Sequence, residues 1–209
     1  MCCGHDHDHE HDHEQVVLFQ GDSVTDCGRG WDNPVGMGNG YAMMAAAMFQ
    51  ARYPEAEVTF YNRGISGNRV KDLQARWQQD CIDLQPSVVS ILIGINDTWR
   101  FFDSNMRTTA AEFAEHYRAM LEDVRTRTDA NLILCEPFLL PIPEDRAAWR
   151  EDLDPKIHIV RSLAREYGAI YVPFDGIFAQ ASTRQELAFW AADGVHPTPA
   201  GAALMAEAW

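Results

Sequence analysis

The stretch Val16-Val17-Leu18-Phe19-Gln20-Gly21-Asp22-Ser23 decides the fold, because a short apolar run ends there in a glycine and two polar residues. A run of this length, bounded by a turn residue, predicts a buried strand over 16–20. Gly21 permits a sharp turn that would present the Ser23 hydroxyl at the N-terminus of a helix. Ser and Asp are also the preferred helix caps, so the triplet by itself is compatible with a purely structural role.

The rest of the chain repeats this alternation of short apolar runs and longer amphipathic stretches. Further strands are predicted at 57–61, 87–93, 131–135 and 169–172. Apolar residues at three- and four-residue spacing predict helices at 40–53, 70–84, 109–126 and 152–167. The strand segments are nearly continuous in apolar residues, as expected when helices cover both faces of a sheet. The pattern therefore predicts an α/β fold, a three-layer α/β/α sandwich around a five-stranded parallel sheet.

The composition is that of a single globular domain over residues 15–209. The chain has 209 residues, of which 46% are hydrophobic and 23% charged, enough to bury a sizeable core. Its formal net charge of -14 argues against nucleic-acid phosphates and anionic membrane surfaces as partners. Five acidic residues lie within residues 1–14, so the remainder carries a net charge of about -9 and is still acidic.

Residues 1–14 alternate His with Asp or Glu after Met-Cys-Cys-Gly, which predicts a disordered tail. We interpret it as an engineered purification tail that catalysis does not need. The alternative is transition-metal binding through its histidines, which are His5, His7, His9, His11 and His13.

The five cysteines are scattered, with neither the spacing of a metal site nor a disulfide framework, which favours a reducing compartment. The sequence shows neither a signal peptide nor an apolar segment long enough to span a bilayer. Together these features predict a cytoplasmic protein.

Polar or small residues follow three of the predicted strands: Ser23 the first, Gly64 the second and Asn96 the third. The carboxyl ends of parallel strands lie at one edge of the sheet, where ligands bind. A serine nucleophile needs a base and donors for the oxyanion. We therefore predict Ser23 as nucleophile and an oxyanion hole made by the N–H groups of Ser23 and Gly64 and the amide of Asn96. The simpler reading of Gly64 is a turn glycine.

The base is predicted in Asp193-Gly194-Val195-His196, a loop just before a short terminal helix. Asp193 precedes His196 by three residues, so one turn could bring the carboxylate to the imidazole Nδ1–H. These two residues therefore complete a predicted Ser-His-Asp triad. His116 and His158 lie within amphipathic periodicity, which is typical of structural or solvated histidines.

Together these clusters resemble the four sequence blocks of the SGNH hydrolase superfamily, also called GDSL esterases and lipases, from Val16 to about Ala208. Longer strings are similar to its bacterial acetylxylan esterase branch: GDSVTDCGR at 21–29, RGISGN at 63–68, LQARW at 73–77 and IGINDTWR at 93–100. The resemblance implies a flavodoxin-like fold, the triad Ser23, Asp193 and His196, and an oxyanion hole from Ser23, Gly64 and Asn96. It implies no metal or organic cofactor.

The resulting functional hypothesis is a serine esterase that hydrolyses short-chain acyl esters and deacetylates xylo-oligosaccharides or related carbohydrates. Trp31, Trp99 and Trp190 lie near the proposed catalytic loops in sequence and could stack on sugar rings, or could be core residues. We expect 94–108 to be a polar loop that does not resemble an apolar lid. A homo-oligomer is compatible with the sequence.

Two alternatives stay open. A lipase, lysophospholipase or thioesterase of the same superfamily would keep the triad and differ in its pocket. A flavodoxin-like nucleotide-binding module would use helix N-termini to hold phosphate, but no glycine-rich phosphate motif follows a strand here.

Overall fold

A computed structural model of the chain describes residues 15–30 and 32–209. Its strands form one sheet, in which all the neighbouring pairs are parallel and the order is β2-β1-β3-β4-β5. The strands are β1 Gln15–Gly21, β2 Val58–Asn62, β3 Val88–Leu92, β4 Asn131–Cys135 and β5 Ile170–Val172. The predicted fold class and all five predicted strands are confirmed. The order reverses at β1, and such a reversal opens a crevice between β1 and β3.

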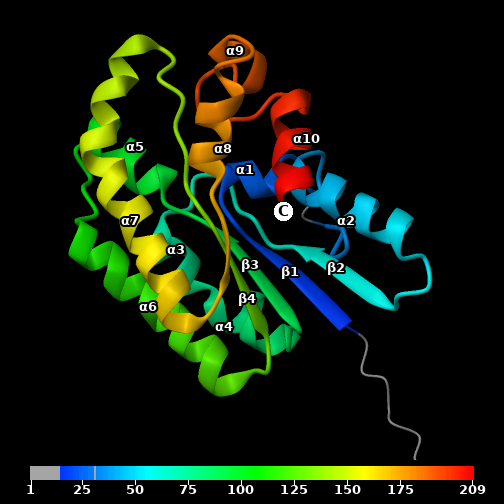
Figure 1. Cartoon of the computed structure of the whole chain (residues 1–209). Coiled ribbons are helices and arrows are strands. Elements are labelled where there is room, and N and C mark those ends of the chain that lie inside the picture. Colours follow the sequence, from blue (N-terminus) through cyan, green and yellow to red (C-terminus); the bar gives the residue numbers. More distant parts are fainter. Residues whose placement is uncertain (1–14, 31) are drawn as a thin grey trace, which may run out of the picture.

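Helices cover both faces of the sheet (Figure 1). The helices α3, α4, α6 and α7 lie on one side, and α2, α8 and α10 lie on the other. The helical segments are α1 Ser23–Asp26, α2 Tyr41–Arg52, α3 Val70–Ala75, α4 Trp77–Asp80, η1 Ile82–Leu84, α5 Ile95–Ser104, α6 Ala110–Arg127, η2 Glu144–Trp149, α7 Arg150–Tyr167, α8 Phe174–Ala181, α9 Leu187–Trp190 and α10 Pro199–Ala208.

The strands contribute side chains to two apolar cores because successive side chains of a strand point to opposite faces of the sheet. In β1, Phe19 packs in the core beneath α2 and α10, with its ring centroid 5.8 Å from that of Tyr41. Leu18 is buried in the opposite core, where the indole N–H of Trp77 donates to the carbonyl of Met120 at 3.1 Å. Both faces of the sheet are therefore buried under apolar side chains, as the continuous apolar runs predict.

One helix prediction and one loop prediction need correction. The segment 70–84 is not one helix, because the backbone of Arg76 leaves helical geometry between α3 and α4. There the Arg76 side chain donates to Asn68 Oδ1 and Gln20 Oε1, contacts that a continuous helix would have to redirect. The segment 94–108 is not simply a polar loop, because most of it forms α5. Its buried face contains Ile95 and Thr98, one turn apart, and the polar residues at its end conceal that periodicity in the sequence.

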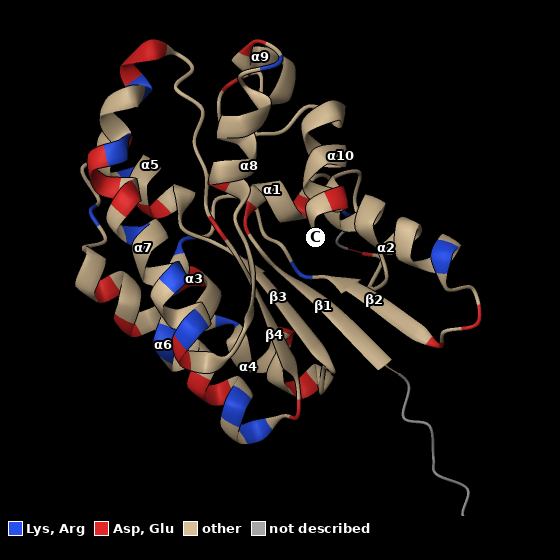
Figure 2. Ribbon diagram, in the orientation of Figure 1, with Lys and Arg blue, Asp and Glu red and all other residues tan. Residues whose placement is uncertain are grey.

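Charged residues concentrate on the helices and loops, whereas the strands are largely free of them (Figure 2). On α6 and α7 the two signs are interspersed, and Arg118 pairs with Glu166 across these helices at 2.9 Å. No helix among the described residues has the length and apolarity needed to cross a membrane. The predictions for residues 1–14 and Trp31 lie outside the described residues.

Candidate active site

The crevice between β1 and β3 is where the predicted nucleophile and the predicted amide donor meet. Gly21 and Leu92, the last residues of these neighbouring strands, are paired in register. Ser23 begins α1 directly after β1, and Asn96 lies in the first turn of α5 after β3. A Cβ at Gly21 would lie 2.5 Å from the carbonyl oxygen of Leu92, so the turn that delivers Ser23 requires glycine.

Ser23, His196 and Asp193 form a continuous hydrogen-bonded chain. Ser23 Oγ lies 2.8 Å from His196 Nε2, and His196 Nδ1 lies 2.7 Å from Asp193 Oδ2. Asp193 Oδ1 also accepts the backbone N–H groups of Val195 at 3.0 Å and His196 at 2.8 Å. Partial burial raises the pKa of Asp193, but these hydrogen bonds outweigh it and lower that pKa below its ordinary value. The carboxylate therefore stays ionised and holds the imidazole in place.

Asp22, and not Ser23, caps the N-terminus of α1. Its Oδ1 accepts the N–H of Val24 at 3.0 Å. This arrangement leaves the Ser23 hydroxyl to the imidazole. Asp22 is 1% exposed, and burial raises its pKa to about 7. Its carboxyl group therefore titrates near neutral pH directly beside the serine.

The two glycines of the 63–68 motif have different surroundings. The N–H of Gly64, the predicted oxyanion donor, is buried and donates to Asn62 Oδ1 at 2.9 Å, so it is already engaged. A Cβ at Gly64 would lie 2.3 Å from the backbone nitrogen of Asp26, which identifies Gly64 as a close-packing residue. Gly67 is exposed with φ +84°, and among the described residues no group accepts a hydrogen bond from its N–H. No local signal in RGISGN distinguishes this second glycine from the first as the candidate donor.

Asn96 is 4% exposed and its Nδ2 donates to the carbonyl of Asn68, the residue after Gly67, at 3.1 Å. The amide is therefore held against the same loop. Asn68 and Asp97 brace these loops through hydrogen bonds. Asn68 Oδ1 accepts from Arg76 Nε at 2.8 Å, and Asp97 Oδ2 accepts the N–H of Val70 at 3.0 Å. These bonds tie the starts of α3 and α5 together.

Buried polar side chains also attach α5 to α7. Thr98 Oγ1 donates to Asp152 Oδ2 at 2.8 Å, and Lys156, which is fully buried, pairs with the same carboxylate. Both partners of Thr98 lie on α7. Helix α5 is therefore tied to α3 through Asp97 and to α7 through the next residue, Thr98, and these contacts hold Asn96 in place.

The fold separates Trp99 and Trp190, the two predicted sugar-binding tryptophans that the structure describes. The ring of Trp99, on α5, lies 6.1 Å from the ring of His196 between centroids, and 5.5 Å from that of Trp149. Trp190, on α9, packs partly buried against the core beneath α10, and its Nε1 has no hydrogen-bond partner among the residues that the structure describes. Trp99 is thus the predicted tryptophan that the structure brings against the triad. His116 and His158 lie within α6 and α7.

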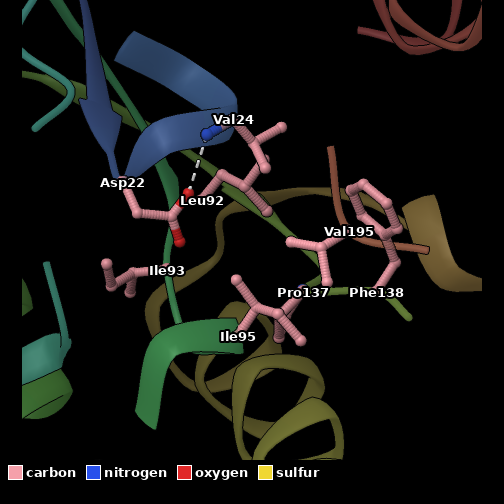
Figure 3. Close-up of a pocket in the computed structure, with 8 residues that line it drawn as sticks. All are labelled: Asp22, Val24, Leu92, Ile93, Ile95, Pro137, Phe138 and Val195. Carbon is pink, nitrogen blue, oxygen red and sulfur yellow. Dashed lines mark hydrogen bonds between the residues drawn. The ribbon is translucent and has the colours of Figure 1, made fainter. Parts of the chain in front are cut away.

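Residues next in sequence to Ser23, Asn96 and His196 contribute to the lining of a small apolar cavity (Figure 3). Its volume is about 10 Å³, and it is lined by Asp22, Val24, Leu92, Ile93, Ile95, Pro137, Phe138 and Val195. Four of these residues are chain neighbours of Ser23, Asn96 and His196. A cavity of this size has room for about one water molecule or methyl group.

The arrangement can perform acyl transfer. An imidazole placed between a serine hydroxyl and a carboxylate accepts the serine proton and later returns it to the leaving group. The helix start at Ser23 and the Asn96 amide place donors on the side where an oxyanion would form.

Comparison with known proteins gives a consistent result. A sequence model of the GDSL-like Lipase/Acylhydrolase family matches residues 19–204. An acetylxylan esterase from Geobacillus stearothermophilus is 35% identical over 202 residues, covering 93% of this chain and 92% of the relative. The solved structure of this bacterium's esterase Axe2 superposes with a TM-score of 0.85 at 33% identity, covering 93% of this chain and 91% of that one.

A second solved structure, from Parabacteroides merdae and named as a GDSL-like lipase, has a TM-score of 0.89 at 36% identity and covers 94% of both chains. Two further Axe2 structures are of catalytic mutants, one with alanine in place of a serine and the other with alanine in place of a histidine.

Proposed function

Because the chain belongs to the GDSL-like lipase/acylhydrolase family, we propose that it is an acetylesterase that deacetylates xylo-oligosaccharides or related carbohydrates. Membership makes the chain a carboxylic ester hydrolase with the SGNH fold. The proposal concerns the roles of its residues, the length of the acyl group and the alcohol to which that group is attached.

In the proposed reaction Ser23 is the nucleophile. His196 takes the Ser23 proton as Oγ attacks the ester carbonyl, and it then protonates the departing sugar oxygen, which leaves as a hydroxyl. Water, deprotonated by the same imidazole, attacks the acyl-enzyme, and the imidazolium returns that proton to Ser23 Oγ as acetate leaves. Asp193 keeps the imidazole oriented throughout. The observation that carries this assignment is the 2.8 Å contact between Ser23 Oγ and His196 Nε2.

The oxyanion of the tetrahedral intermediate would accept hydrogen bonds from the N–H of Ser23, the amide of Asn96 and a third N–H. We assign the third donor to Gly67 in place of Gly64. The Gly64 N–H is already bonded to Asn62, whereas Gly67 precedes the residue whose carbonyl holds the Asn96 amide.

The size of the cavity that is lined in part by Asp22 and Val24, the chain neighbours of Ser23, supports a short acyl group. Its roughly 10 Å³ would accept the methyl of an acetyl group and would exclude a longer chain unless the lining moved. The position of Trp99 beside His196 supports a carbohydrate alcohol, because an indole face can stack on a sugar ring. The relative that is 35% identical is named as an acetylxylan esterase, which points to the same class of substrate.

A chain-length series tests the acyl assignment. We expect kcat/KM on p-nitrophenyl esters to fall from acetyl through butanoyl to octanoyl. Val195→Ala, which enlarges the cavity, should raise the ratio of butanoyl to acetyl rates. Val160→Ala, buried in the opposite core, should leave that ratio unchanged. A wild-type preference for octanoyl esters would favour a lipase, and a preference for acyl thioesters would favour a thioesterase.

A second assay tests the alcohol. We expect kcat/KM for acetate release to be higher on acetylated xylo-oligosaccharides than on a simple alkyl acetate. Trp99→Ala should remove this difference, mainly by raising KM for the oligosaccharides. Equal rates on both substrates would overturn the carbohydrate assignment and leave the esterase assignment intact.

A further inference from the structure

Arg146 lies outside the triad but contacts both halves of the site. It belongs to η2, in the segment between β4 and α7. The carbon of its guanidinium lies 4.4 Å from the ring centroid of Trp99 and 4.7 Å from that of Trp149. The cation is thus held against two indole rings, a geometry in which each ring attracts it.

The same guanidinium donates through Nη1 to the backbone carbonyl of Asp193. One residue later, the carbonyl of Gly194 accepts the N–H of Leu140 at 2.9 Å. Gly194 has φ +81°, and a Cβ there would lie 2.1 Å from the carbonyl oxygen of Leu140. The loop that carries Asp193 and His196 is therefore seated closely on residues 136–149, and Arg146 supplies the side-chain part of that attachment.

Trp99 connects this attachment to the other half of the site. It lies on α5 one turn after Asn96, and its ring is 6.1 Å from that of His196. A guanidinium can lie flat on the Trp99 ring while its in-plane N–H bonds the Asp193 carbonyl. A lysine ammonium has no planar face and cannot reproduce both contacts together.

We propose that Arg146 is a positioning residue that holds the loop of Asp193 and His196 against Trp99, and so sets the distance from His196 to Ser23. This role rests on the ester-hydrolase assignment but not on the identity of the sugar. Displacement of a catalytic group by about 1 Å can cost about a hundredfold in rate. The expected loss therefore falls on the chemical step, whereas ester binding is largely preserved.

The test compares Arg146→Ala and Arg146→Lys with the wild-type enzyme on p-nitrophenyl acetate. For Arg146→Ala we expect kcat to fall about tenfold to a hundredfold, with KM changed by less than about threefold. Arg146→Lys should recover only a minor part of the loss. Guanidinium chloride at tens of millimolar should partly restore Arg146→Ala, whereas sodium chloride at equal ionic strength should not. Arg118→Ala, which breaks an exposed ion pair on α6, is the matched control and should resemble wild type.

The proposal is overturned if Arg146→Ala keeps kcat within about twofold of wild type, a change too small for a misplaced base. It is also overturned if the loss of activity in Arg146→Ala is due wholly to a higher KM. A third contrary result is a loss of activity that equals the fraction of unfolded enzyme and that guanidinium does not reverse. If wild type hydrolyses the chromogenic ester but not acetylated xylo-oligosaccharides, the carbohydrate proposal fails while this test still stands.

Discussion

Ser23 and His196 stand 173 positions apart in the sequence, yet Ser23 Oγ and His196 Nε2 lie 2.8 Å apart. The first comes directly after β1 and the second from the loop before α10, which packs beside α2 on the same side of the sheet. Asp193 lies on the far side of the imidazole. The reactive group is therefore assembled by the tertiary fold from the two ends of the domain.

The first prediction concerns this pair. Ser23→Ala and His196→Ala should each lower kcat on p-nitrophenyl acetate by about six orders of magnitude, because each removes an essential part of one proton-transfer chain. An organophosphate should label Ser23 covalently in the wild-type enzyme and leave Ser23→Ala unlabelled. Ser104→Ala, at the exposed end of α5, should be fully active and labelled. Normal turnover in Ser23→Ala would refute the assignment.

The second prediction concerns Asn96. Asn96→Ala should lower kcat about a hundredfold, the usual effect of removing one oxyanion donor, and should change KM little. The amide stabilises charge that develops only in the transition state, so substrate binding does not depend on it. Asn131→Ala, an exposed position at the opposite end of β4, serves as the control. A rise in KM at constant kcat would indicate a binding role for Asn96.

The third prediction separates the two glycines. Gly64→Ala should fold poorly and lower Tm strongly, because its Cβ would collide with the backbone of Asp26. Gly67→Ala has open space for its Cβ, so it should fold and lose only about 1–2 kcal/mol from its positive φ. Alanine keeps the backbone N–H, so if Gly67 is the donor, activity should fall because relaxation of the positive φ turns that N–H away from the oxyanion. Full activity in Gly67→Ala would show that this relaxation displaces no catalytic donor and would return the oxyanion role to another group.

The fourth prediction follows from the buried carboxyl of Asp22. Its pKa is about 7 in the folded protein and 3.8 in the reference state. Between these values the unfolded chain releases the proton while the folded chain retains it, so rising pH lowers the free energy of unfolding. Above pH 7 this loss is complete and stays constant.

Asp22→Asn keeps an oxygen for the Val24 N–H but cannot ionise. Its stability relative to wild type should therefore rise between about pH 4 and pH 7, by at most about 4 kcal/mol. Urea unfolding at about pH 4 and about pH 8 measures the difference. Asp129→Asn, at an exposed position, should show no such pH dependence. If the free energy of unfolding of Asp22→Asn relative to wild type is the same at about pH 8 as at about pH 4, the raised pKa of Asp22 is contradicted.

Local patterns in the sequence were sufficient for much of this description. Alternating apolar runs predict the strands because a strand buried on both faces has apolar side chains on each. The spacing of Asp193 and His196 predicts their contact because one turn of chain brings them together. The position of Ser23 after the first strand predicts the edge of the sheet at which it lies.

Other features depended on partners far away in the chain. The break at Arg76 follows from its contact with Gln20, and no local propensity predicts it. The same is true of the engaged N–H of Gly64, whose packing against Asp26 separates a structural glycine from a candidate donor.

By itself, then, the sequence determined the parallel sheet, the serine at its edge and the acid-base pair, since each arises from periodicity or short spacing within one segment. Only the tertiary structure decided which glycine faces solvent, that Trp99 lies beside His196, and that Arg146 reaches the carbonyl of Asp193. Those relationships are contacts between segments far apart in the chain, and they exist only once packing has brought the segments together.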